Sequence, residues 1–151
     1  MRIAAGLLAA ATLAGATACS ASDQPAHAKA QAAVAASTRP AETFTPLLQQ
    51  ALPNVKGTTF TSAIVAFPPG TNALPHRHGQ AFIYAYVLEG TVRSKLDGKP
   101  VTTYHQGDNW VEQPGAHHVL TENASRTKPA KLLVVFVSDT GAKLKADDPK
   151  S

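Results

Sequence analysis

The chain is poor in cysteine, in charged residues and in aromatic residues. Its 151 residues include a single cysteine, Cys19, so a framework of intrachain disulfides is excluded. Charged residues make up only 16% and aromatic residues 6%, whereas 44% of the residues are hydrophobic. This composition argues against a largely disordered chain, and the length suits one domain with an apolar core.

The excess of charge of one sign is also small, because 14 Lys and Arg residues against 10 Asp and Glu residues give a formal net charge of +4. Basic residues are scattered along the sequence, and near the C-terminus Lys143 and Lys150 flank Asp147 and Asp148. A nucleic-acid-binding protein gathers its basic residues on one face. We therefore expect no nucleic-acid partner and interpret the excess of basic residues as solvated surface.

The N-terminus is typical of a bacterial export signal. Arg2 supplies a positive charge, and residues 3–18 are uncharged and rich in Ala and Leu. This stretch is shorter than the roughly 20 residues that a membrane-spanning helix needs. A buried N-terminal helix is the alternative, but the stretch is apolar on all sides and ends in small residues. The segment predicts export to the periplasm.

Two modes of signal cleavage are compatible with the sequence. Residues 15–19 resemble a lipobox, in which the cysteine becomes lipid-modified and starts the mature chain, although Ala16 stands where Leu is usual. Ordinary signal-peptidase cleavage at the Ala-x-Ala sites of residues 26–28 or 16–18 is the alternative. We favour Cys19 as the lipidation site, because a free thiol is otherwise unusual in an exported chain. Ser20 then suits a lipoprotein of the outer membrane, and the lipid anchor is the only membrane contact we expect.

Composition divides the rest of the chain. The segment after the signal is rich in Ala, Gln and Ser and predicts a disordered, flexible tether, with an Ala-rich helix over 28–36 as the alternative. Residues 45–52 are expected to form one helical turn or a leading arm. The expected divisions are a signal over 1–18, a tether over 19–43, a folded domain over 44–140 and a polar C-terminal tail over 141–151.

From residue 58 onward the pattern is that of an all-β protein. Seven candidate strands are rich in β-branched and aromatic residues and are separated by Gly, Pro and Asp turn signals. The continuously apolar stretch 132–137 predicts a central, buried strand. No internal repeat or long helical periodicity is present, which favours a sandwich or barrel. The candidate strands are 58–67, 81–89, 91–96, 100–104, 109–113, 118–122 and 131–137.

Histidines carry the clearest chemical signal. His76 and His78 stand two residues apart at the start of a candidate strand, where alternation points both side chains to the same side. Two imidazoles at this spacing can chelate one metal ion. A pair of surface histidines has the same spacing, so the pair alone does not establish a metal site.

Two motifs in order resemble those of the cupin superfamily. The first places His-x-His after a glycine and five further residues, with another glycine later. Gly70, His76, His78 and Gly90 follow this pattern. The resemblance covers roughly residues 67–137 and implies a single antiparallel jelly-roll β-barrel.

The second motif adds a third histidine. In the family, Gly is followed after five residues by Pro-x-Gly, then after two residues by His. Gly107, Gly115 and His118 follow this spacing. The resemblance implies that His76, His78 and His118 bind one divalent metal ion. Imidazole suits Fe, Zn, Cu and Ni. The sequence does not distinguish among Fe, Zn, Mn, Ni and Cu as the bound ion.

Three positions depart from the family pattern. The Glu of the first motif falls at Ile83, or at Phe82 with the shorter spacing, and neither side chain binds a metal. In the second motif Gln113 replaces the first Pro, with Pro114 next, and the final Asn is displaced to Asn123. The lost carboxylate implies a three-histidine site, as in some cupin non-haem iron dioxygenases. Such a site carries one more positive charge and should prefer an anionic ligand.

Four further residues could contribute near the site. Gln80 and Glu112 are candidate auxiliaries that could partly replace the missing carboxylate, and for each we expect a solvated or indirect role. His117 adjoins His118, so an extended backbone turns it to the opposite face, at the rim of the barrel. Trp110 is the best aromatic candidate for the wall of a binding pocket.

Two functions follow from this reading. The first is a metal-dependent enzyme acting on a small molecule, of dioxygenase type with iron, or catalysing isomerisation or hydrolysis through a bound water with zinc. The second is a non-catalytic module that binds a metal or a small ligand, favoured by the lack of an obvious general base beside the metal. Cupins host many activities, so the fold does not choose between them. The resemblance also implies a homodimer formed through the sheets.

Overall fold

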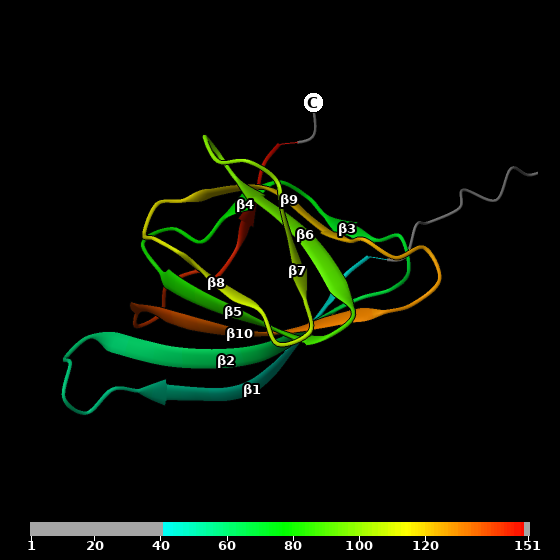
Figure 1. Cartoon of the computed structure of the whole chain (residues 1–151). Coiled ribbons are helices and arrows are strands. Elements are labelled where there is room, and N and C mark those ends of the chain that lie inside the picture. The colour runs from blue at the N-terminus through cyan, green and yellow to red at the C-terminus, as the bar shows by residue number, and fades with distance from the viewer. Residues whose placement is uncertain (1–40, 150–151) are drawn as a thin grey trace, which may run out of the picture. The chain divides into compact units, whose positions relative to one another are not determined.

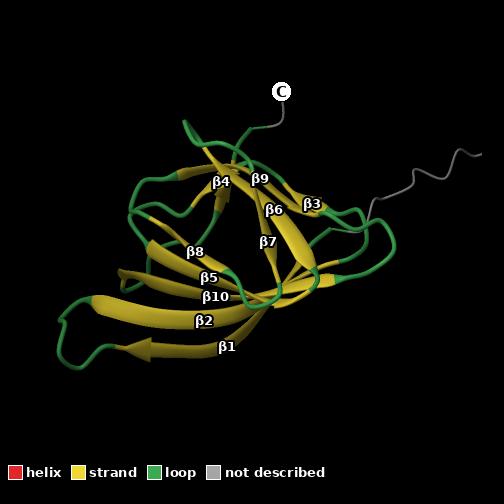
Figure 2. Ribbon diagram, in the orientation of Figure 1, coloured by secondary structure: helices red, strands yellow, loops and turns green. Residues whose placement is uncertain are grey.

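The computed structural model describes residues 41–149, and in this range the chain is built of β-strands without a helix (Figure 1, Figure 2). The predicted export signal, the lipidation site at Cys19 and nearly all of the tether lie outside the described residues. No helix in the described range is long and apolar enough to cross a membrane. The strands are β1 (Thr43–Ala51), β2 (Thr58–Phe67), β3 (Asn72–Ala73), β4 (His76–Arg77), β5 (Phe82–Glu89), β6 (Thr91–Leu96), β7 (Thr102–His105), β8 (Asn109–Glu112), β9 (His117–Asn123), β10 (Ala130–Asp139) and β11 (Ala146–Asp147).

Two antiparallel sheets form the barrel. One has the order β1-β2-β10-β5-β8, and the other has the order β11-β4-β9-β6-β7, with β3 also paired to β9. The first sheet lies below the second in Figure 1. The pairs β1-β2 and β6-β7 are consecutive in the sequence, whereas the other neighbouring strands come from separate parts of the chain. This is the all-β jelly-roll barrel that the sequence predicted.

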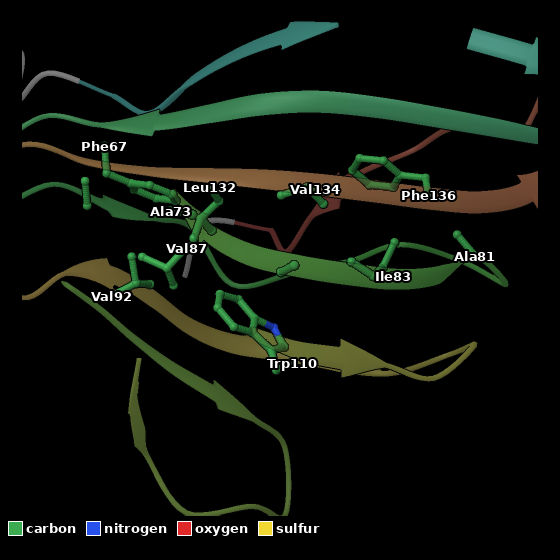
Figure 3. Close-up of a cluster of buried hydrophobic side chains, with 12 residues drawn as sticks. Phe67, Ala73, Ala81, Ile83, Val87, Val92, Trp110, Leu132, Val134 and Phe136 are labelled. Atoms are coloured by element: carbon green, nitrogen blue, oxygen red, sulfur yellow. The ribbon is translucent and has the colours of Figure 1, made fainter. Parts of the chain in front are cut away.

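Alternation along the strands explains how each sheet acquires a buried face. In β10 the side chains of Leu132, Val134 and Phe136 are buried, whereas the residues between them are partly exposed. In β5, Ile83 and Val87 are buried from the neighbouring strand. These side chains meet in the interior of the barrel (Figure 3). Strand β10 lies between β2 and β5, so the prediction of a central, buried strand is confirmed.

The structure differs from the sequence-based expectation at both ends of the domain. The segment expected as a helical turn or leading arm belongs to strand β1, which pairs with β2 along its length. Every residue of β1 is exposed, so the strand lacks the buried alternation by which strands are recognised. At the other end, residues 141–149, expected as a polar tail, contribute β11, which pairs with β4, and Leu144, which packs against the core.

Gly90 of the first motif is required by the backbone. It lies between β5 and β6 with φ of +78°, a conformation that residues with a side chain rarely adopt. A Cβ atom at this position would lie 2.6 Å from the carbonyl oxygen of Pro129. Both effects exclude larger residues, so this motif position serves the turn and not the chemistry.

The displaced Asn of the second motif also has a structural role. Asn123 is buried, and its Nδ2 group donates to the carbonyl oxygens of Phe67, Pro68 and Lys128 at 2.7–3.2 Å. Its Oδ1 accepts the backbone N–H of Ser125 at 2.9 Å. The side chain thus ties the end of β9 to the end of β2 and to the loop before β10.

Candidate metal centre

Three histidine side chains come together inside the barrel. His76 lies in β4 directly opposite His118 in β9, and His78 follows β4. One ligand nitrogen from each ring lies within 4.8 Å of the other two, and His76 and His118 are only 6% and 3% exposed. Nitrogens bound to one ion at about 2.1 Å lie at most about 4 Å apart. The most widely separated nitrogens therefore need to move about 1 Å closer to share an ion.

Two of these rings are held by backbone carbonyls. Nδ1–H of His76 donates to the carbonyl oxygen of Leu74 at 2.7 Å, and Nδ1–H of His78 donates to that of Leu144 at 2.6 Å. A proton on Nδ1 leaves the lone pair of Nε2 free to bind a metal, and such outer hydrogen bonds orient ligating histidines. Leu144 belongs to the C-terminal segment, so the far end of the chain positions a candidate ligand.

Burial keeps these imidazoles neutral. Desolvation lowers the pKa of His76 to about 4, even though the hydrogen bond to Leu74 opposes the shift. Desolvation also lowers the pKa of His78, opposed by its bond to Leu144 and by the charge of Glu112. Neutral imidazole is the form that binds metal, so neither ring has to lose a proton at neutral pH.

The third ring has different partners. Nε2 of His118 lies 2.8 Å from Oγ of Ser94 and 2.7 Å from Oγ1 of Thr121, two hydroxyl groups buried on the same sheet. Nδ1 of His118 lies 3.0 Å from Oε1 of Glu112. In this ring Nδ1 therefore faces the carboxylate, whereas in His76 and His78 Nδ1 faces a carbonyl.

Glu112 is buried beside the histidines and is only 3% exposed, so the solvated role that the sequence left open for it is wrong. Oε1 accepts the indole N–H of Trp110 at 3.2 Å, and Oε2 lies 3.8 Å from Nε2 of His78. Burial alone would raise the pKa of this carboxyl, but the hydrogen bond and charge of His118, with His78 and Trp110, hold the pKa below its usual value.

The atom Oε2 of Glu112 is buried and accepts no hydrogen bond. A buried carboxylate oxygen without a partner is costly, because it has lost water and gained nothing in exchange. A cation bound among the histidines would lie beside this oxygen and offset that cost. The donor set of imidazoles and carboxylate thus fits a divalent transition-metal ion.

The histidines line a cavity of about 300 Å³ between the sheets. Its other walls are largely apolar and include Ile83, Trp110, Val134 and Phe136, which Figure 3 shows pointing into the interior. Trp110 therefore lies where the sequence suggested. The ring of Phe136 contacts that of His78, with 5.4 Å between the centroids.

The two ends of the described chain meet at the cavity. Lys145 lines it and forms ion pairs with Glu42 at 2.7 Å and with Asp147 at 2.9 Å. Nε2 of His117 lies 2.8 Å from a carboxylate oxygen of Asp148. His117 is outside the cavity wall, as expected for a residue on the face opposite to His118, and it helps to hold the C-terminal segment.

The two positions considered for the missing carboxylate differ in location. Gln80 is exposed and is not part of the cavity wall, so it does not replace a ligand. Ile83 is 1% exposed and lines the cavity, so the side chain at the position of the family's Glu does face the histidines.

Sequence reasoning underestimated Glu112 and missed the hydroxyls of Ser94 and Thr121. One signal for Glu112 was present, because it stands two residues after Trp110 in the same strand. Alternation gives both residues one face, and Trp110 had been assigned to the pocket wall. No local signal marked the carbonyl of Leu144, because it reaches His78 from the far end of the domain.

Comparison with known proteins supports the same fold. Residues 63–136 match the family model of the cupin domain, a range that includes all three histidines and Glu112. No curated protein matches the sequence.

Solved structures resemble the barrel at low sequence identity. A conserved protein with a double-stranded β-helix domain from Klebsiella pneumoniae has 20% identity and a TM-score of 0.57, covering 74% of this chain and 90% of that one. The cupin domain of Schizosaccharomyces pombe Cnp3 has 14% identity and a TM-score of 0.55, covering 66% and 62%. The DMSP lyase DddQ from Ruegeria pomeroyi has 20% identity and a TM-score of 0.56, covering 68% and 49%.

The chain thus spans 62% of the Cnp3 structure and about half of the lyase. At these identities the likeness shows the fold, and the barrel, the two histidine motifs and the matched residues agree with it. Residues 63–136 therefore form a small cupin-type conserved barrel, as the match to the cupin domain model and the shared fold agree.

Proposed function

We propose that the protein binds one divalent metal ion between His76, His78 and His118 and acts on a small molecule in the adjoining cavity. The observation that carries this proposal is the convergence of three buried imidazoles at the wall of a cavity of about 300 Å³. Burying three polar imidazole rings together costs hydration free energy, and a bound cation would offset this cost.

The residues of the chain prepare the site before a ligand arrives. The carbonyls of Leu74 and Leu144 fix the rings of His76 and His78, so little reorganisation is needed on binding. The apolar walls exclude water and strengthen electrostatic interactions in the cavity. A bound ion would supply Lewis-acid chemistry to an oxygen of the substrate and, if it is iron, the redox chemistry of a dioxygenase-type reaction.

The cavity also limits the ligand. A volume of about 300 Å³ lies at the lower end of small-molecule pockets, so the ligand is small. Apolar walls favour an apolar body, and a divalent ion in a low-dielectric site favours an anionic or oxygen-bearing end. The proposed ligand therefore has an apolar body and one polar group that reaches the centre.

An enzyme is the leading proposal, of dioxygenase or isomerase type according to the metal. A structurally similar protein is a DMSP lyase, so this fold does host catalysis, although that likeness does not assign the reaction. A non-catalytic metal- or ligand-binding module is the second candidate. It is favoured by the apolar character of the cavity, in which Glu112 is the only buried carboxylate among the described residues that line it.

We also propose that the protein is exported, as a periplasmic protein or as an outer-membrane lipoprotein anchored through Cys19. A homodimer stays a prediction. The outer face of the first sheet supports it, because Tyr84 and Val135 are half-buried and Val111 is 44% exposed, and these apolar side chains are neighbours across β10, β5 and β8. Sedimentation of the purified protein would give the oligomeric state.

Elemental analysis of protein produced in its own host tests the metal centre. We expect about one ion per chain in the wild type, loss of the ion in His78→Ala, and retention in His105→Ala, in which an exposed histidine at the end of β7 is removed. Metal-free wild-type protein that also fails to bind added ions would refute the proposal, as would full retention in His78→Ala. A substrate screen with the native metal loaded then separates enzyme from binding module.

A further inference from the structure

We infer that Glu112 supplies a fourth, carboxylate ligand to the metal centre, and that His118 binds through Nδ1 rather than through Nε2. This inference rests on the proposed metal centre and specifies its ligands. It assigns to strand β8 the carboxylate that the first sequence motif lacks at Ile83.

The pairing of β5 with β8 brings the carboxylate to the right place. Glu112 stands directly opposite Ile83 in the register of these antiparallel strands. Both side chains are buried and line the cavity. Directly opposed residues on one face of a sheet have Cβ atoms about 4.5–5.5 Å apart, within the reach of a glutamate side chain. A carboxylate from position 112 can therefore serve an ion that one from position 83 would otherwise serve.

The carboxylate oxygens are spaced as ligands are. Oε1 lies 3.0 Å from Nδ1 of His118, and Oε2 lies 3.8 Å from Nε2 of His78. Two atoms bound to one ion at about 2.1 Å are about 3 Å apart at a right angle and about 4 Å apart when opposite. Both distances fall within this range. Oε2 accepts no hydrogen bond, so this buried atom is available to an ion without losing another partner.

The hydroxyl groups around His118 occupy Nε2 and leave Nδ1 as the nitrogen that faces the carboxylate. Ser94 and Thr121 both lie within 2.8 Å of Nε2, on the side of the ring away from the carboxylate. An ion at Nδ1 leaves the ring proton on Nε2, where it is donated to one of these hydroxyl oxygens. His76 and His78 have the opposite arrangement, because their Nδ1 protons are donated to carbonyls. The three rings would thus bind through Nε2, Nε2 and Nδ1.

This ligand set changes the charge of the site. A divalent ion with three neutral imidazoles carries two positive charges, and the carboxylate of Glu112 reduces this to one. A single monoanionic group on the ligand then neutralises the buried centre, whereas a dianion would leave an excess negative charge in an apolar cavity. The preference for anions that a site of three histidines alone would show is therefore narrowed to monoanions.

Nitrogen-15 NMR of the zinc-loaded wild-type protein tests the inference without a variant. We expect the long-range proton–nitrogen spectrum to show His118 protonated at Nε2 and zinc-bound at Nδ1, with His76 and His78 protonated at Nδ1. Zinc bound at Nε2 of His118 would overturn the inference, since Glu112 would then be only an outer hydrogen-bond partner of that ring. A wild-type protein that binds no zinc would instead refute the metal centre itself.

Zinc affinity of variants gives an independent readout. Loss of an outer partner costs about 10–100-fold in affinity, so loss of a ligand in Glu112→Gln should exceed about 100-fold. Glu89→Gln is the matched control, because Glu89 is 44% exposed at the end of β5, paired with Lys131, and absent from the cavity wall. An affinity of Glu112→Gln within about 100-fold of wild type would overturn the assignment.

The double variant Ile83→Glu/Glu112→Ile tests the cross-strand argument directly. It exchanges the two opposed side chains and keeps the composition of the barrel. We expect it to recover zinc affinity to within about tenfold of wild type, because the carboxylate reaches the same ion from the neighbouring strand. A folded double variant as weak as Glu112→Gln would contradict the inference. Urea unfolding of each metal-free variant shows that the barrel is intact.

Discussion

The hydrogen bond between the C-terminal segment and His78 predicts that the end of the chain controls metal affinity. Nδ1–H of His78 donates to the carbonyl oxygen of Leu144 at 2.6 Å, across 66 positions in the sequence. Deleting residues 143–151 removes this acceptor and leaves the ring free to rotate. Loss of such an outer partner weakens metal binding by about 10–100-fold, which corresponds to about 1.4–2.7 kcal/mol. We expect a loss of that size for zinc, measured by competition with a chromophoric chelator.

The deletion also has a calculable effect on folding. It removes the pairing of β11 with β4, the hydrogen bonds from Asp148 to Pro75 and from His78 to Leu144, the contacts of Leu144 with the core, and the ion pairs of Lys145. A net hydrogen bond is worth about 1 kcal/mol, a partly exposed ion pair less than about 1 kcal/mol, and partial burial of a leucine about 1 kcal/mol. With about 1 kcal/mol for each of the hydrogen bonds and for the strand pairing, we expect the metal-free protein to lose about 3–5 kcal/mol of unfolding free energy and to stay folded.

Two controls isolate the carbonyl. Ending the chain after Asp148 keeps all of these contacts and should leave affinity unchanged. Leu144→Ala keeps the backbone acceptor, so its affinity should fall only a few-fold even though an apolar contact is lost. A folded deletion variant that binds zinc within about twofold of wild type would refute the role of the C-terminal segment in orienting His78.

Three further predictions address stability and export. Because burial lowers the pKa of His76 to about 4, the unfolded chain takes up a proton near pH 6.5 that the folded chain takes up only near pH 4. The unfolding free energy of the metal-free protein should therefore fall by up to about 3 kcal/mol as the pH is lowered from 6.5 to 4. In His76→Asn, the unfolding free energy measured with urea should depend less on pH in this range. Asn123→Ala should destabilise the domain by about 1–3 kcal/mol in the same assay, because it strands buried carbonyl groups, with zinc affinity unchanged. Cys19→Ser should release the protein from host membranes without altering its circular dichroism, and an unmodified cysteine in the mature wild-type chain, detected by mass spectrometry, would exclude lipidation.

Local pattern was sufficient for most of the barrel. The candidate strands 58–67 and 91–96 coincide with β2 and β6, because alternation and turn residues act over a few positions. The segment that became β1 was not recognised as a strand, since none of its residues is buried and its partner β2 alone defines it. The short strands β4 and β11 were missed for a similar reason. Each is only two residues long and is defined by pairing with a distant segment.

The sequence alone determined the barrel fold and the identity of the three histidines, because strand alternation and motif spacing are properties of neighbouring residues. Only the tertiary structure decided which groups surround them. The carboxylate of Glu112 stands across from Ile83 through the register of β5 with β8, and the carbonyl of Leu144 reaches His78 from the end of the domain. Register is fixed by the packing of the whole barrel, since a slip of one residue would turn each side chain to the opposite face. The chemistry of the centre therefore depends on contacts that no local stretch of the sequence encodes.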